Sequence, residues 1–177
     1  MRTFYTIGHS NHPIEKFLDL LKTYEIDSLC DVRSKPYSRY HPQFRYEQLK
    51  TVLQKQDIHY VFLGQALGGK PDDLSCYEEG ELQYARVVET ERFQTGLLEL
   101  KTQISTFRVA LMCAEKEPLD CHRTILICRH LRDEQFTIKH ILANGCLEDQ
   151  AHTEKRLIDK FKLAPDLAFK EKLAQAY

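Results

Sequence analysis

Five short apolar runs alternate with stretches of helical periodicity along this chain, and this alternation constrains the fold more than any other feature. The runs span residues 2–10, 26–32, 58–64, 107–114 and 136–142. Apolar residues recur three and four positions apart in 11–25, 45–56, 81–104 (with a break expected near Thr90) and 124–134, as on one face of a helix. Strands that alternate with helices favour a parallel sheet. We therefore predict an α/β fold: a three-layer Rossmann-like sandwich, with a mainly parallel five-stranded sheet and helices on both faces.

The length of 177 residues suits one hydrophobic core, so residues 1–177 are predicted to form a single α/β domain with a C-terminal helix at about 149–163. The formal net charge of -1 gives the chain as a whole no attraction to nucleic acid or to membranes. The sequence has neither a membrane-spanning apolar stretch nor a signal-peptide pattern. We expect a cytoplasmic protein with no membrane partner, whose six scattered cysteines are thiols.

Polar residues gather where the predicted strands end. In open parallel sheets, ligands bind outside the carboxyl ends of the strands, where helix N-termini also point. The candidates at these ends are Gly8, His9 and Ser10 after the first run, Asp31, Arg33, Ser38 and Arg39 after the second, Gly68 and Gly69 after the third, and Glu115, Cys121, His122 and Arg123 after the fourth. We predict that the functional site lies on this one edge of the sheet.

The candidates belong to four ordered segments: YTIGHSNHPIEKFLDLL, CDVRSKPYSRYHPQF, YVFLGQALGG and VALMCAEKEPLDCHRTIL. Together, over about residues 3–142, these segments resemble the bacterial and archaeal family named domain of unknown function 488. The resemblance implies an α/β fold and signature residues in all four segments, and it implies no particular reaction.

The hypothesis of an anion-binding pocket accounts for most of the candidate residues. The guanidinium groups of Arg33, Arg39 and Arg123 can each bind a phosphate through paired hydrogen bonds. Hydroxyl groups and glycines that permit close backbone approach complete the predicted substrate-binding set: Ser10, Ser38, Gly8, Gly68 and Gly69. We therefore expect a phosphate-containing substrate, either a small molecule such as a nucleotide or a nucleic acid.

The predicted catalytic set is His9, His122, Asp31, Glu115 and Cys121. His9 and His122 would move protons, while Asp31 or Glu115 would orient an imidazole and raise its pKa. This interpretation predicts a hydrolase or transferase acting on nucleotide or nucleic-acid substrates.

Rhodanese-like thiol chemistry is a second hypothesis, because a helix N-terminus and neighbouring positive charge would lower the pKa of Cys121. A metal site is a third. Its ligands would be either Cys113, Cys121, His122 and His9, or Asp31 and Glu115 around a divalent cation. The chain lacks the paired cysteine spacing of structural zinc sites, so the metal and any other cofactor stay unknown at this point.

A non-catalytic module is the fourth hypothesis, since residues 35–46 interleave tyrosines with basic side chains suited to nucleotide or nucleic-acid binding. A structural explanation also exists for two candidates: Asp31 and Arg33 could form an ion pair, and Arg123 could bond a buried carbonyl group. The sequence does not indicate an oligomeric state.

Overall fold

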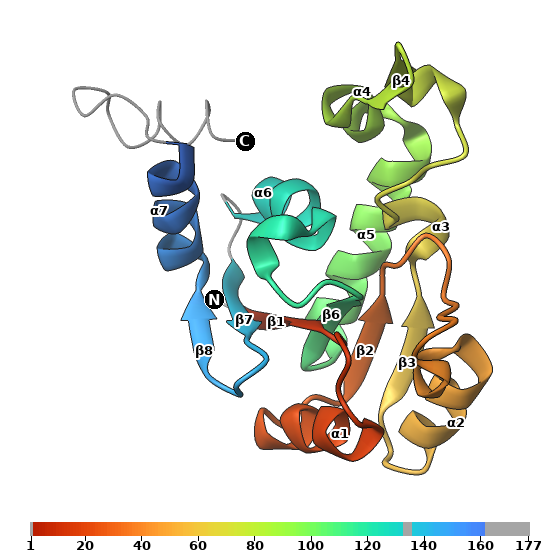
Figure 1. The fold of residues 1–177 in the computed structure, drawn as a ribbon, viewed down its shortest axis with the longest axis vertical. Helices are drawn as coiled ribbons and strands as arrows, with labels where there is room; N and C mark the ends of the chain where they lie inside the picture. The colour runs from red at the N-terminus through yellow and green to blue at the C-terminus, as the bar shows by residue number, and fades with distance from the viewer. Residues whose placement is uncertain (1, 133–135, 162–177) are drawn as a thin grey trace.

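The computed structural model describes residues 2–132 and 136–161, and its centre is a six-stranded sheet with strand order β3-β2-β6-β1-β7-β8 (Figure 1). The strands are β1 (Arg2–Gly8), β2 (Ser28–Asp31), β3 (His59–Phe62), β6 (Val109–Cys113), β7 (Phe136–Ile141) and β8 (Leu147–Asp149). All of them pair in parallel except β8, which runs antiparallel to β7. The predicted α/β class with a mainly parallel sheet is confirmed.

The strand β8 corrects the predicted count of five strands in the sheet. It is three residues long and follows a turn in which Gly145 has a φ angle of 90°. A strand this short, with only one apolar residue, has no periodicity that distinguishes it from the polar start of the next helix. The sequence pattern therefore could not reveal it.

The strand β6 lies between β1 and β2, and all five of its residues are buried. Strands covered on both faces are typically apolar throughout, as β6 is. Its last residue, Cys113, pairs with Gly8 of β1, while Met112 pairs with Asp31 of β2. The segments that leave β1, β2 and β6 therefore start side by side.

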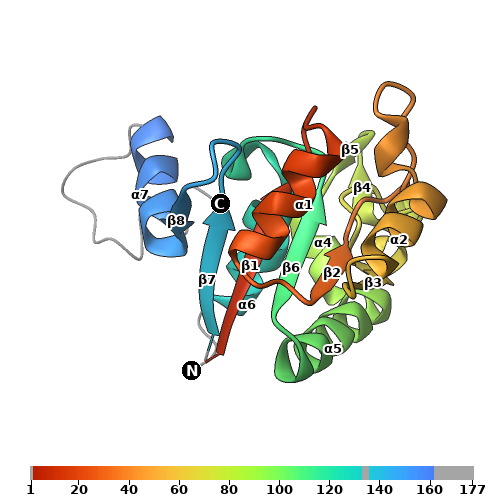
Figure 2. The same ribbon diagram turned by 90° about the horizontal axis from the view of Figure 1, so that it is seen from below.

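Helices cover both faces of the sheet (Figures 1 and 2). The helices α1 (Ile14–Thr23) and α2 (Tyr46–Gln54) bury their apolar residues on one face. The opposite core cluster is built by α4 (Tyr84–Glu89), α5 (Glu91–Thr106), a π-helix (Arg123–Cys128) and α6 (Arg129–Leu131). Thr90 separates α4 from α5 because its hydroxyl group accepts the Phe93 N–H at 3.2 Å and caps α5.

The remaining elements lie at the ends of the sheet and at its edge. They are α3 (Gly64–Leu67), the hairpin of β4 (Tyr77–Glu78) and β5 (Glu81–Leu82), α7 (Gln150–Phe161), and 3-10 turns at Pro42–Phe44, Leu74–Cys76 and Pro118–Asp120. The helix α7 is the predicted C-terminal helix, of which residues 162–163 fall outside the described residues. Within residues 2–132 and 136–161, no helix combines the length and apolar character needed to cross a membrane.

A buried polar network joins α7 to the sheet. The Thr6 hydroxyl group donates to His140 Nδ1 at 2.8 Å, and His140 Nε2 donates to Gln150 Oε1 at 2.9 Å. The His140 side chain has no exposed surface, and burial lowers its pKa to about 4. The ring is therefore neutral in the folded protein at neutral pH.

We predict that the free energy of unfolding of the His140→Gln variant decreases less than that of the wild type when the pH falls into the mildly acidic range. The unfolded chain binds a proton at His140 below about pH 6.5, whereas the folded chain resists it until about pH 4, so this contribution to stability is lost as the pH falls between those values. Between about pH 7.5 and pH 5 the wild type should lose about 2 kcal/mol more than the variant in urea unfolding. The exposed His152, changed to Gln, is the control, and an equal loss in wild type and His140→Gln would contradict the prediction.

Candidate functional site

A cleft of about 890 Å³ opens at the carboxyl ends of β1, β2 and β6. Its walls include His9 after β1, Arg33 after β2 and Cys113 at the end of β6. Residues from the loops 34–41 and 69–72 also line it, as do the segment after β6, the β4 hairpin and α4. The cleft therefore lies on the edge of the sheet that the sequence singles out.

Asp31 is fully buried, and both of its carboxylate oxygens already have partners. Arg33 Nη2 lies 2.6 Å from Oδ2 and Arg33 Nε lies 2.9 Å from Oδ1, while the Tyr60 hydroxyl group donates to Oδ2 at 2.7 Å. Asp31 thus forms the structural ion pair that the sequence allowed. It contacts no imidazole and presents no free oxygen to a divalent cation, in contrast to two roles predicted for it.

Arg33 is 5% exposed and still lines the cleft. Its Nη1 atom lies 3.3 Å from His9 Nε2, so three of the five guanidinium N–H groups bond to Asp31 and His9. The other two have no partner among residues 2–132 and 136–161. Arg33 can therefore hold its ion pair and still donate hydrogen bonds to a ligand.

His9 is locked in place by contacts on both ring nitrogens. Its Nδ1 atom donates to the Ser10 carbonyl oxygen at 2.8 Å, Nε2 faces Arg33, and the ring stacks on Phe44 with 4.3 Å between centroids. Burial, followed by the charge of Arg33, lowers the pKa of His9 to about 4. The charge of Asp31 acts to raise this pKa, as predicted for a carboxylate, but burial and the charge of Arg33, which lies between the ring and Asp31, outweigh it.

Arg123 has no exposed surface, and its guanidinium group bonds to the chain itself. Nη1 donates to the Glu115 carbonyl oxygen at 2.7 Å, Nη2 lies 3.5 Å from that of Lys116, and Nε lies 3.4 Å from Thr6 Oγ1. This placement does not support the predicted phosphate-binding role of Arg123. The guanidinium group fixes the segment that follows β6, as in the structural explanation considered above.

The remaining polar candidates are divided between the cleft and the surface. Ser10 and Ser38 line the cleft. Ser10 has a positive φ angle of 50°, which turns the chain away from β1, and the Ser38 hydroxyl group accepts the His41 N–H at 3.0 Å. Arg39 is exposed and is not among the residues that line the cleft.

The three candidate glycines are approached by the chain itself. A Cβ atom on Gly8 would lie 1.9 Å from the Glu115 carbonyl oxygen, and one on Gly68 would lie 2.3 Å from that of Gly64. A Cβ atom on Gly69, which does line the cleft, would lie 2.8 Å from His122 Nδ1. These glycines serve close packing within the protein, in contrast to the predicted close approach of a substrate.

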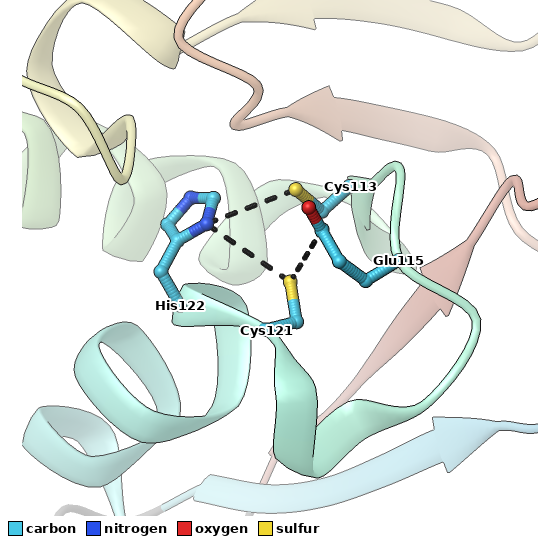
Figure 3. Close-up of side chains that lie close together, drawn as sticks. All are labelled: Cys113, Glu115, Cys121 and His122. Carbon is cyan, nitrogen blue, oxygen red and sulfur yellow. Dashed lines mark hydrogen bonds between the residues drawn. The ribbon is translucent and has the colours of Figure 1, made fainter.

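Cys113, Glu115, Cys121 and His122 form a compact cluster in one wall of the cleft (Figure 3). The Cys121 sulfur lies 3.1 Å from Glu115 Oε2, and His122 Nδ1 lies 3.8 Å from the Cys113 sulfur and 4.0 Å from the Cys121 sulfur. His122 Nε2 donates to the Val32 carbonyl oxygen at 3.0 Å. The cluster thus brings together Glu115, Cys121 and His122 of the predicted catalytic set, and it adds Cys113, which the sequence names with Cys121 and His122 in one of its two candidate metal-ligand sets.

The two thiols of the cluster hold their protons very differently. Burial acts to raise the pKa of Cys121, but the hydrogen bond with Cys113 and the charge of Arg123 outweigh it and lower this pKa to about 5. The same hydrogen bond, together with burial, raises the pKa of Cys113. The pair therefore gives up its first proton readily and its second only with difficulty. Cys121 is only 1% exposed, and all six cysteines of the chain are free thiols, as predicted.

Several side chains that line the cleft are absent from the predicted site residues, among them Lys35, Lys70, Tyr77 and Tyr84. The sequence places both lysines at predicted strand ends, after the second and third runs, and Lys35 also begins the basic aromatic segment 35–46, but neither lysine is part of the predicted site. The tyrosines could not be found from the sequence, because they lie on the β4 hairpin and on α4, far along the chain from any predicted strand end.

The chain matches the family model described as Domain of unknown function DUF488 over residues 13–129. The matched region contains β2, β3, β6 and the whole Cys113–His122 segment, while β1 with His9 and Ser10 lies before it. Neither the curated proteins nor the solved structures gave a significant match.

We predict that Arg123→Met destabilises the fold, because the substitution leaves the carbonyl groups of Glu115 and Lys116 without their donor and removes the bond to Thr6. The expected loss is about 3 kcal/mol, or a fall in Tm of about 6–12 °C for a chain of this size. Thermal unfolding followed by circular dichroism measures it, with Arg39→Met as the exposed control. An unchanged Tm for Arg123→Met would mean that the guanidinium group does not hold the loop after β6.

Proposed function

The chain belongs to the DUF488 family, and we propose that it is an enzyme that acts on a phosphate-bearing substrate of nucleotide size within the cleft at the strand ends. The observation that carries the proposal is the composition of this cleft, which combines cationic, aromatic and acid–base side chains around one volume of about 890 Å³. The reaction class is hydrolysis or group transfer.

Three cations support a phosphate on one side of the cleft. Lys35 and Lys70 are exposed and form no ion pair with any residue of the described part of the chain. Their loops are joined, because the Ser34 hydroxyl group accepts the Lys70 N–H at 2.9 Å. Arg33 adds its two free N–H groups from the floor. Ammonium and guanidinium groups of this kind are the usual partners of phosphate oxygens.

Aromatic rings support a base or another flat group beside the phosphate. Tyr77 and Tyr84 are half-buried and line the same cleft, and the Tyr77 hydroxyl group donates to the Pro71 carbonyl oxygen at 2.9 Å, which steadies the loop that carries Lys70. Rings of this kind bind nucleobases by stacking without selecting their sequence. The cleft volume is within the range that suits a small ligand.

Glu115 is the proposed proton acceptor. Its side chain is exposed, lines the cleft, and has no cationic partner among the residues described, unlike Asp120, which pairs with Lys160 at 3.0 Å. Hydrogen bonds from Cys113 and Cys121 lower the pKa of Glu115 despite the opposing effect of burial, so the carboxylate is ionised at neutral pH. His9 acts as a positioning residue, because its ring fixes the guanidinium group of Arg33.

Binding of a single-stranded nucleic-acid end is the second candidate, and it rests on the exposed rings next to the cleft. Tyr37 and Tyr40 are 64% and 81% exposed, and Arg45 lies over the Tyr37 ring at 4.7 Å from its centroid. Under this candidate, Tyr40→Ala weakens the binding of an oligonucleotide and leaves that of a mononucleotide unchanged. Thiol transfer through Cys121 has less support, because this sulfur is buried behind Cys113, Glu115 and His122.

We predict that replacing both Lys35 and Lys70 with alanine weakens phosphate binding. Isothermal titration of the full chain with ADP and with inorganic pyrophosphate should give a Kd at least about tenfold higher, since the loss of one charge-assisted contact of about 1.4 kcal/mol changes affinity tenfold. The matched control replaces two exposed lysines outside the cleft, Lys22 on α1 and Lys55 directly after α2. Equal affinities for the two double variants would exclude the cleft as the phosphate site.

Turnover is tested with Glu115→Gln, on a panel of nucleoside mono-, di- and triphosphates and p-nitrophenyl phosphate. General-base catalysis contributes roughly 100-fold or more, so the variant should lose that factor in turnover while its affinity for ADP stays within about threefold of wild type. Glu99→Gln, on the exposed side of α5, is the control. If the wild type binds ADP but converts no compound of the panel, the result would contradict the enzyme hypothesis and support the hypothesis of a non-catalytic binding module.

A further inference from the structure

The cluster of Cys113, Glu115, Cys121 and His122 has the donors of a zinc site, and we propose that it binds one Zn²⁺ ion in the wall of the cleft (Figure 3). Cys113 ends β6, Cys121 and His122 precede the π-helix, and Glu115 lies on the loop between them. The chain therefore brings together two thiols, a carboxylate and an imidazole, with all four donor atoms within 4.8 Å of one another.

The separations of the donor atoms match the edges of a zinc tetrahedron. Zinc bonds of about 2.3 Å to sulfur and about 2.0–2.2 Å to nitrogen and oxygen place a sulfur about 3.6 Å from a nitrogen or oxygen ligand. In the cluster, the sulfur–nitrogen distances are 3.8 and 4.0 Å and the sulfur–oxygen distance is 3.1 Å. Shifts of about 0.5 Å, within the reach of side-chain rotation, bring these three separations to the tetrahedral value, and the other donor pairs lie within 4.8 Å.

Hydrogen bonds from neighbouring groups orient the donor atoms of the cluster, as is usual around a metal site. Because the Val32 carbonyl oxygen can only accept, His122 Nε2 carries the proton, and the lone pair of Nδ1 faces both sulfurs. A histidine that binds metal through one nitrogen commonly donates from the other to a carbonyl group in this way. The Arg123 backbone N–H also lies 3.4 Å from the Cys121 sulfur, where it would stabilise a thiolate.

The donor set selects zinc over the divalent cations first considered. Thiolate and imidazole ligands favour Zn²⁺, whereas Mg²⁺ and Ca²⁺ require oxygen ligands. Two thiolates and one carboxylate carry a charge of about -3, which Zn²⁺ reduces to about -1. The buried guanidinium group of Arg123, bonded to the Glu115 carbonyl oxygen, lies close enough to offset the remainder. His9 is not a ligand, because both of its ring nitrogens bond elsewhere.

The exposure of the four donors indicates a zinc site in which one protein ligand can be replaced by a molecule from the cleft. Cys113 and Cys121 are buried, His122 is half-buried, and Glu115 is exposed. Catalytic zinc sites hold the ion with three protein ligands and leave the fourth position to water or substrate. Glu115 is the donor that a water molecule or a phosphate oxygen could displace, and the displaced carboxylate would then be free for its proposed role as proton acceptor. The zinc site itself stands on the donor geometry, and only its contribution to catalysis rests on the proposed function.

Metal titration of the reduced full chain tests the site. After removal of metal with a chelator, the wild type should bind one equivalent of Zn²⁺, and Co²⁺ in its place should give a sulfur-to-metal charge-transfer band and the visible bands of a tetrahedral ion. Cys113→Ser, Cys121→Ser and His122→Gln should each weaken zinc binding by more than roughly 100-fold, the upper range for losing only an outer partner. Cys146→Ser and His152→Gln, at exposed positions outside the cluster, should bind as the wild type does.

X-ray absorption at the zinc edge of the loaded wild type gives a readout that does not depend on the folding of any variant. The expected first shell holds two sulfur atoms at about 2.3 Å and two nitrogen or oxygen atoms at about 2.0–2.2 Å. A shell without sulfur, or zinc binding equal in wild type and the Cys113→Ser/Cys121→Ser variant, would overturn the proposal. Turnover by a protein that binds no zinc would refute the zinc site alone, and zinc binding without turnover would refute only the proposed function.

Discussion

The buried guanidinium group of Arg123 is the interaction on which the site depends. It holds the carbonyl groups of Glu115 and Lys116, so the loop after β6 folds back against the start of the π-helix, where Cys121 and His122 lie. Through Thr6 the same group is connected to His140, and from there to Gln150 on α7. One charged side chain without exposure thus links the loop of the cleft to the sheet and to the C-terminal helix. A buried charge is tolerated where it is paired or hydrogen-bonded, and for Arg123 carbonyl and hydroxyl oxygens provide the hydrogen bonds.

The sequence predicts the layers of this fold well because they depend on apolar periodicity, which a chain displays residue by residue. It also predicts the edge at which the cleft lies, because the direction of parallel strands determines it. The sequence could not show which groups each charged side chain bonds to. Arg33 and Arg123 look alike as phosphate ligands in a sequence, yet one pairs with Asp31 and the other with main-chain oxygens. Gly8 likewise indicates that another group closely approaches the backbone there. The sequence does not show whether that group is a ligand or, as in the structure, the Glu115 carbonyl oxygen.

The cluster of two thiols, a carboxylate and an imidazole lacks the cysteine spacing that is usual for structural zinc sites, for a related reason. Paired cysteines in structural zinc sites come from one tight turn, which fixes their spacing along the chain. Here one cysteine ends a strand and the other follows a loop and a 3-10 turn, so the spacing reflects the path of that loop. The π-helix that begins at Arg123 continues this segment, and such helices are rare and are found frequently at functional sites. Tertiary structure, more than local sequence, brings these donors together.

The contact between Gly69 and the ring of His122 has a consequence for how the two walls of the cleft behave. An atom added to Gly69 would overlap Nδ1 of that ring, so the loop that carries Lys70 rests directly on the cluster of donors. A ligand on Lys70 and a ligand on the imidazole would therefore act on two segments in direct contact. Any effect of one on the affinity of the other would be reciprocal, with the same factor in both directions.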